Sequence, residues 1–163
     1  MKRRPLGSSL RDPGKCLNFL DSCAFDPDSA PEYKASRVIY QLYQNNQISL
    51  QVNHSTKKEI ERPNTPAWVK REARDFNYTI PTKLIPVEQK QKTEIWEILT
   101  RNGKPENYKE DAEHVFTAGK HVGYFITADK RILKKKIEIE KISPVKIVKP
   151  TEFIKIPDMY ENT

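Results

Sequence analysis

Four carboxylates stand out in this sequence because each lies beside an apolar segment that is expected to be part of a core: Asp21, Glu59, Asp111 and Asp129. Carboxylates gathered in one place repel one another. A hard divalent cation such as Mg²⁺ or Mn²⁺ relieves that repulsion, because it prefers carboxylate and water ligands. Such a cation activates water and neutralises charge that builds up on phosphate oxygens. The four acids together therefore predict metal-dependent chemistry on a phosphate ester.

Two of these acids follow expected strands. Asp21 ends the apolar run 16–20, which is typical of a buried strand, and Asp129 comes soon after the strand expected over 124–127. Ligands of open parallel sheets bind outside the carboxyl ends of the strands. Both acids are therefore expected at the edge of the sheet where a binding site would form.

The other two acids are expected at the same edge, on helices. Glu59 lies about one turn into the short helix that follows the second expected strand. Asp111 lies in the first turn of a helix expected over 109–120, and that turn begins at the same edge. We therefore expect all four carboxylates to converge, with Lys130 and Arg131 as the basic residues that the sequence places near them.

Apolar periodicity over the rest of the chain predicts the remaining elements. Helices are expected over 30–44, 56–61, 65–76, 88–100 and 109–120, and strands over 16–20, 48–52, 124–127 and 145–148. We interpret 77–87, which contains two prolines, as a connection and 130–136 as a basic helical turn. Short strands that alternate with helices predict a three-layer α/β/α domain with a mainly parallel sheet of about four or five strands.

The composition is that of one basic domain. The chain has 163 residues, and 29 Lys and Arg against 22 Asp and Glu give a net charge of +7, which favours polyanionic partners such as RNA or DNA. We expect residues 1–15 to form a mobile basic arm, residues 16–156 the folded domain and residues 157–163 a tail. No apolar run approaches the roughly 20 residues that span a bilayer, and no signal peptide is apparent. We therefore expect a cytoplasmic protein without a membrane partner.

The cysteines and histidines argue against two other kinds of site. If Cys16 and Cys23 lie on one strand, their Cα atoms are about 23 Å apart, much farther than the roughly 7 Å that a disulfide spans. The histidines, His54, His114 and His121, are scattered, and neither cysteine lies near them at a spacing typical of zinc sites. The sequence therefore predicts neither a disulfide nor a zinc site.

Several segments, taken in order, resemble the PIN domain family. They are LNFLDSCAF at 17–25, S-x-x-x-E at 55–59, EDAEHVFTA at 110–118, FITADKR at 125–131 and the ending VKIVKPTEF at 145–153. The similarity covers about Cys16 to Ile154, nearly the whole chain. The order of the acids and the length of the domain also match the family.

The resemblance implies a ribonuclease that depends on Mg²⁺ or Mn²⁺ and cleaves RNA with a metal-activated water. It implies that Asp21, Glu59, Asp111 and Asp129 hold the metal and that Thr127 orients the last acid or a metal-bound water. Many small members are VapC-type toxins, which commonly dimerise and are held inactive by a small antitoxin protein. The implied partners are therefore an RNA substrate, an antitoxin and a second copy of the chain.

Other functions fit the same residues. A non-catalytic nucleic-acid-binding or scaffold protein could keep this fold, and a nuclease that processes DNA or rRNA could use the same site. A receiver domain that accepts a phosphoryl group is disfavoured. Such a domain needs an adjacent acidic pair near the end of its first strand and a Lys after a late strand, whereas this chain offers Asp21 alone and Asp129 after Thr127.

Each acid also has a purely structural interpretation. Asp21 could end a strand in a turn, and Glu59 could be an exposed glutamate like its neighbour Glu61. Acids in a first helical turn, such as Asp111, are favoured by the helix dipole. Asp129 could cap the turn that follows it, and capping does not exclude metal binding.

Overall fold

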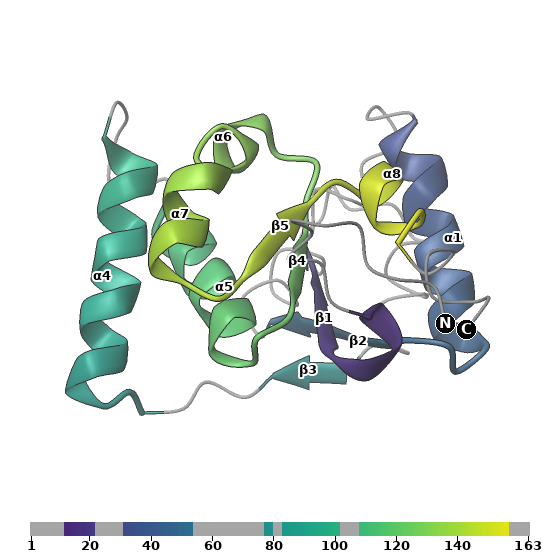
Figure 1. Ribbon diagram of the computed structural model, residues 1–163, viewed down its shortest axis with the longest axis horizontal. Helices are drawn as coiled ribbons and strands as arrows, with labels where there is room; N and C mark the ends of the chain where they lie inside the picture. The colour runs from purple at the N-terminus through teal and green to yellow at the C-terminus, as the bar shows by residue number, and fades with distance from the viewer. Residues whose placement is uncertain (1–11, 22–30, 54–76, 80–82, 102–107, 157–163) are drawn as a thin grey trace, which may run out of the picture.

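The computed structural model describes residues 12–21, 31–53, 77–79, 83–101 and 108–156 (Figure 1). Within this part the protein is an α/β domain built on a five-stranded sheet in which all neighbouring strands are parallel, in the order β3-β2-β1-β4-β5. The strands are β1 (Leu17–Leu20), β2 (Ser49–Asn53), β3 (Asn77–Thr79), β4 (Tyr124–Ile126) and β5 (Lys146–Val148). The predicted fold class is confirmed.

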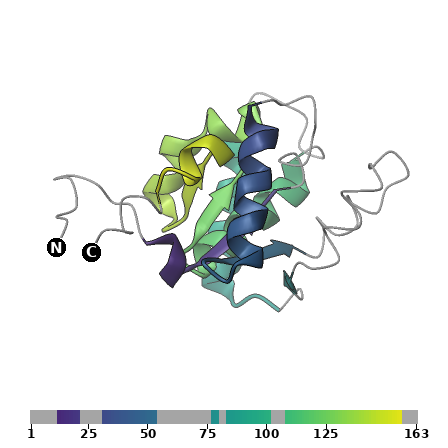
Figure 2. The same cartoon turned by 90° about the vertical axis from the view of Figure 1, so that its right-hand side faces the viewer.

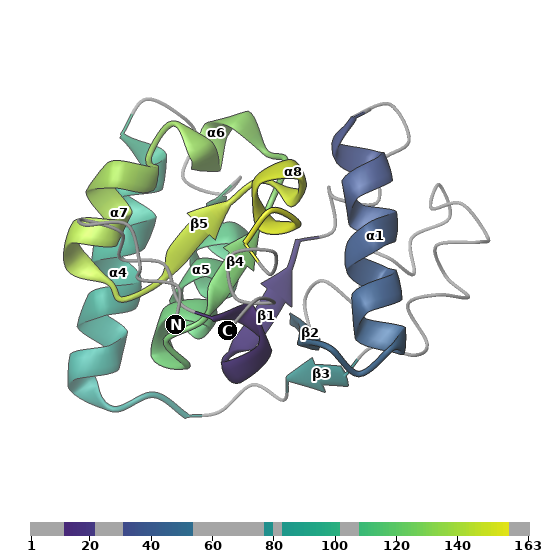
Figure 3. The same ribbon diagram turned by 45° about the vertical axis from the view of Figure 1, so that its right-hand side comes forward.

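Helices cover both faces of the sheet. On one side lie α1 (Glu32–Gln44) and α8 (Pro150–Phe153), and on the other lie α4 (Pro86–Thr100), α5 (Lys109–Lys120) and α7 (Lys136–Ile142) (Figures 1 and 3). Viewed from the side of α1, that helix runs across the front of the sheet (Figure 2). A short helix, α6 (Lys130–Leu133), links β4 to α7, and a 3-10 turn, η1 (Pro13–Lys15), precedes β1.

Alternation of side chains along the strands divides the core between these two faces. In β4 the buried Tyr124 and Ile126 pack with the cluster under α1 and α8, whereas Phe125 packs with the cluster under α4, α5 and α7. In β1, Leu20 packs with the cluster under α1 and α8, and Phe19 packs with the cluster on the opposite face. Successive side chains of a strand point to opposite faces. An apolar strand of this kind must therefore be covered on both sides, as the sequence predicts.

Strand β1 is fixed by a buried polar side chain. Asn18 is fully buried, and its amide nitrogen donates to the carbonyl oxygens of Pro13 at 3.0 Å and Ser49 at 2.8 Å. The 3-10 turn is therefore tied to β1 and β2, and Pro13 is buried with it. Residues 12–15 thus belong to the folded domain and not to the predicted basic arm, of which 1–11 lie outside the described residues.

A glycine allows β4 to pair closely with β1. A Cβ atom at Gly123 would lie 2.0 Å from the carbonyl oxygen of Leu17, a distance that no larger residue could accept without a shift of the strand. The turn before it carries Val122 in the left-handed region, with φ of 54°. Together these residues turn the chain from α5 into β4 at the centre of the sheet.

Two elements differ from the sequence prediction. The connection predicted over 77–87 contains β3, a three-residue edge strand, and α4 begins at its end, at Pro86. The basic turn predicted over 130–136 is α6, and α7 follows it in a segment with no predicted element. In α7, Ile139 is fully buried whereas Ile137 is 70% exposed. Contact with the core, and not a strong sequence pattern, therefore selects the helix.

Other predictions lie outside the described residues. They are the helices over 56–61 and 65–76 and the tail 157–163. Of the cysteines, Cys16 lies just before β1, with its Sγ 3.6 Å from Oδ1 of Asn18, and Cys23 is not among the described residues. In the part of the chain that the structure describes, no helix combines the length and the apolar character needed to cross a bilayer.

Candidate functional site

The carboxyl edge of the two central strands carries the first two site residues. The backbone N–H of Asp21 donates to the Ile126 carbonyl at 2.9 Å, and that of Thr127 donates to the Val148 carbonyl at 2.9 Å. These bonds continue the parallel pairing one residue past the ends of β1 and β4. Asp21 and Thr127 are therefore held side by side at the carboxyl edge, where the sequence places them.

The hydroxyl of Thr127 links two of the predicted acids. It donates to Oδ2 of Asp21 at 2.8 Å and accepts the backbone N–H of Asp129 at 3.0 Å. Thr127 is fully buried, and Asp21 is only 4% exposed. Burying a carboxylate is costly unless it is hydrogen-bonded, so this hydroxyl stabilises Asp21 in the core and fixes the start of the next segment.

Asp129 caps α6, as its structural interpretation predicts, and it also binds the side chain of Arg131. Its Oδ1 accepts the backbone N–H of Arg131 at 2.9 Å and the Nε–H at 3.1 Å, while its Oδ2 accepts from Nη2 at 2.7 Å. The guanidinium therefore forms a fork on the carboxylate, a geometry that is stronger and more directional than a single contact.

The same contacts set the ionisation of the pair. Partial burial raises the pKa of Asp129, but hydrogen bonds from the side chain and backbone of Arg131 outweigh it, so that the pKa lies below its ordinary value. The hydrogen bond to Asp129 raises the pKa of Arg131, and the charges of Asp129 and Asp111 add to this effect. Asp129 is therefore ionised and Arg131 is charged at neutral pH.

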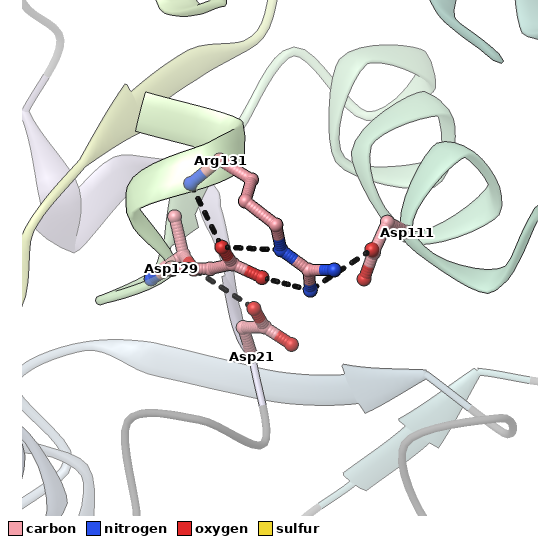
Figure 4. Close-up of polar contacts among 5 residues, drawn as sticks. Asp21, Asp111, Asp129 and Arg131 are labelled. Atoms are coloured by element: carbon pink, nitrogen blue, oxygen red, sulfur yellow. Dashed lines mark hydrogen bonds and ion pairs between the residues drawn. The ribbon is translucent and has the colours of Figure 1, made fainter. Parts of the chain in front are cut away.

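Asp111 approaches from the first turn of α5. Its Oδ2 lies 3.9 Å from Nη2 of Arg131, an ion pair too long for a hydrogen bond, and its side chain is 16% exposed. Figure 4 shows the guanidinium between Asp129 and Asp111, with Asp21 close to Asp129. The ring of Tyr108, the residue that precedes α5, lies against the guanidinium, with Cζ of Arg131 5.1 Å from the ring centroid.

The structure therefore places three of the four predicted acids in one neighbourhood, from β1, α5 and the start of α6. They are joined through the hydroxyl of Thr127 and the guanidinium of Arg131. The fourth acid, Glu59, is not among the described residues. His114, one turn after Asp111 on α5, is buried in the core.

Arg131 is the residue whose role the sequence left open. It belongs to a basic run, 130–136, that is typical equally of a nucleic-acid contact and of a solvated surface. The useful signal is its spacing from Asp129. The second residue after a helix-capping acid donates its backbone N–H to the carboxylate of that acid. If its side chain is long and basic, it can fold back and donate to the same carboxylate.

The donor set fits Mg²⁺ or Mn²⁺ by chemistry, since it consists of carboxylate oxygens and a hydroxyl oxygen. Its present arrangement is organised around the guanidinium instead. Among the described residues, no three His, Cys, Asp or Glu side chains are grouped so that they could hold one metal ion. The predicted metal site stays a prediction, and the cation that the structure shows between Asp129 and Asp111 is the guanidinium of Arg131.

Comparisons with protein-family models and with curated proteins find no match to this chain. The resemblance to the PIN domain family therefore stays a prediction from the sequence motifs.

Proposed function

We propose that the protein is a divalent-metal-dependent endoribonuclease that hydrolyses RNA phosphodiester bonds with a metal-activated water. One observation carries the proposal. Three acidic side chains from separate parts of the chain, Asp21, Asp111 and Asp129, meet at the carboxyl edge of a parallel sheet. Ligands bind at this edge in open α/β sheets, and carboxylate oxygens are the ligands that Mg²⁺ and Mn²⁺ prefer.

Each residue has a defined part in this proposal. Asp21, Asp111 and Asp129 would hold the cation, with Glu59 as a fourth ligand from the sequence prediction. When bound, the cation supplies an acidified water and neutralises charge on the phosphate oxygens. Thr127 holds Asp21 by its hydroxyl and holds the backbone of Asp129, so that it would position both acids for the cation.

The basic surface supports a polyanionic substrate. The net charge is +7, and the exposed Lys134 directly follows α6, the short helix that begins after Asp129. Lysines in such positions would bind phosphates on either side of the scissile bond. Binding of this kind weakens steeply with salt, because each phosphate contact releases counterions.

The cellular role proposed here is that of a toxin controlled by a small antitoxin protein. It rests on the resemblance of the sequence motifs to VapC-type proteins, as do the second copy of the chain and the cytoplasmic location. The chemistry of the site does not depend on this role, so that a nuclease that processes DNA or rRNA would use the same residues.

A second candidate is a non-catalytic nucleic-acid-binding protein. The observation that favours it is the guanidinium of Arg131, which already neutralises Asp129 and lies next to Asp111. A site permanently filled by this side chain would need no metal. The basic surface would then bind RNA without cleaving it.

One cleavage assay separates these candidates. A labelled single-stranded RNA oligonucleotide and the DNA of the same sequence are incubated with increasing Mg²⁺ or Mn²⁺, with EDTA as the metal-free control. We expect metal-dependent cleavage of RNA and a loss of at least a hundredfold in Asp21→Asn and Asp129→Asn. Glu97→Gln is the matched control, since it removes one negative charge from an exposed position on α4.

Two results would reject the proposal. Cleavage by Asp21→Asn at the wild-type rate would show that the site is elsewhere. RNA binding without cleavage at every metal concentration would establish the non-catalytic candidate instead. Cleavage of the DNA alone would keep the site and change the substrate.

A further inference from the structure

We propose that Arg131 is an internal counter-cation, whose guanidinium must leave its place between Asp129 and Asp111 before a divalent metal can bind both carboxylates. This inference rests on the proposed function, because it concerns the same acids. It adds a competitor that belongs to the protein itself. It predicts that metal affinity is set partly by how firmly the acids hold this side chain.

The first support is that a single nitrogen atom of Arg131 forms an ion pair with each of the two acids. Nη2 of Arg131 lies 2.7 Å from Oδ2 of Asp129 and 3.9 Å from Oδ2 of Asp111. A cation bound to both oxygens at about 2.1 Å would lie between them, where this nitrogen lies, and Asp111 would move closer to Asp129 to reach it. Metal and guanidinium therefore cannot bind both oxygens at the same time.

The second support is that the guanidinium can leave without repacking the core. The side chain of Arg131 is 53% exposed, and it is held by the fork on Asp129 and by the face of the Tyr108 ring. Breaking contacts at a half-exposed position costs less than breaking a buried ion pair, because water solvates both charges once they separate. Rotation of the long side chain into solvent would free the position.

The third support is that Asp129 and Asp21 keep contacts that do not depend on the guanidinium. The backbone N–H of Arg131 also donates to Oδ1 of Asp129, at 2.9 Å, and this bond does not depend on the side chain. The backbone of Asp129 stays on the hydroxyl of Thr127, which also holds Asp21. A metal would therefore meet acids that are already positioned by the backbone and by Thr127.

Direct titration of Mn²⁺ tests the displacement without any measurement of activity. Free Mn²⁺ is followed by electron paramagnetic resonance in the full-length wild-type protein, in Arg131→Gln and in Lys130→Gln. The last variant is the matched control, because it removes one positive charge from the neighbouring exposed residue of the same helix. Circular dichroism and thermal melting confirm that each variant is folded.

We expect Arg131→Gln to bind Mn²⁺ about three to ten times more tightly than the wild type, the range that corresponds to the loss of a partly exposed ion-pair network. Lys130→Gln should change the affinity by less than about twofold, because its charge is solvated. Asp129→Asn should weaken binding, which places the bound ion at this site.

The possible results distinguish failure of the displacement by Arg131 from failure of the metal site itself. If wild type and Arg131→Gln bind Mn²⁺ with equal affinity, or if Arg131→Gln binds it more weakly, displacement is wrong and the metal site survives. If the Mn²⁺ affinity of Arg131→Gln rises no more than that of Lys130→Gln, the effect comes from net charge alone and the inference is wrong. If no variant binds Mn²⁺, the proposed metal site and the displacement both fall.

Discussion

Replacing Thr127 by Val tests whether one hydroxyl holds the two sides of the candidate site together. The substitution nearly preserves shape but removes a donor to Oδ2 of Asp21 and an acceptor for the Asp129 backbone N–H. A hydrogen bond to a charged group contributes roughly 1.5–3 kcal/mol, and a buried donor left without an acceptor costs about 1–3 kcal/mol. Since the N–H is only partly buried, we expect Thr127→Val to lower the free energy of unfolding by about 2–4 kcal/mol.

Urea denaturation followed by circular dichroism measures this loss, and thermal melting provides an independent readout. For a domain of this size, each kcal/mol corresponds to roughly 2–4 °C in the melting temperature, so that a fall of about 5–15 °C is expected. Thr127→Ser is the control, because it keeps the hydroxyl and removes one methyl group, at a cost of about 1 kcal/mol. A loss below 0.5 kcal/mol for Thr127→Val would refute the assignment of this hydroxyl as the link.

A double-mutant cycle with Asp21→Asn identifies the partner. If the carboxylate of Asp21 is what the hydroxyl stabilises, Thr127→Val should cost at least about 1 kcal/mol less in the Asp21→Asn background than in the wild type. Additive effects would mean that the stability comes from contacts of Thr127 other than this one.

Three further predictions concern the elements that support the site. Asn18→Leu should destabilise the domain by about 2–4 kcal/mol in urea denaturation, because the backbone carbonyls of Pro13 and Ser49 lose the donor that the buried Asn18 provides; an unchanged midpoint would contradict this. Gly123→Ala should lower the melting temperature by at least about 5 °C, since its Cβ would lie 2.0 Å from the Leu17 carbonyl oxygen; a wild-type melting temperature would show that the strands separate freely. Lys120→Gln should raise the pKa of Glu88 in an NMR titration, because the hydrogen bond from Lys120, at 2.9 Å, is the main cause that lowers it. The ion pair stabilises the fold at pH values above the ordinary glutamate pKa, and this stabilisation is lost as the pH falls through the lowered pKa of Glu88. If the pKa of Glu88 is the same in the variant as in the wild type, the assignment is wrong.

Local patterns predict the fold where they agree with the tertiary structure. The helix over 109–120 is observed with those bounds, because its apolar residues recur at helical spacing and all face the core on one side of the sheet. Strand β1 is predictable for a different reason. It is covered on both faces, and its short apolar run ends at a charged residue.

The elements that were missed depend on contacts distant in sequence. Strand β3 has only three residues, and it is a strand because it pairs with β2 at the edge of the sheet. In α7 the sequence KIEIEKI alternates in polarity with a period of two, which does not indicate a helix. It packs instead with Ile139 buried and Ile142 partly buried, three residues apart on the helix face that meets the core.

The candidate site was predictable in its acids and not in its cation. The ends of strands and the starts of helices identify Asp21, Asp111 and Asp129, because the topology of a parallel sheet brings such positions to one edge. Which of Lys130 and Arg131 turns back to the acids depends on side-chain conformation, and sequence spacing alone does not determine it. The capping role of Asp129 selects Arg131, whose backbone N–H is on that carboxylate.

A crystal of the protein soaked in Mn²⁺ shows whether the carboxyl edge of the sheet binds a divalent cation. We expect an anomalous scattering peak at a Mn²⁺ position within about 2.2 Å of oxygens of Asp129 and Asp111, with Asp21 beside them and the guanidinium of Arg131 turned away. A peak elsewhere on the molecule, or no peak with Arg131 still between the two acids, would contradict it.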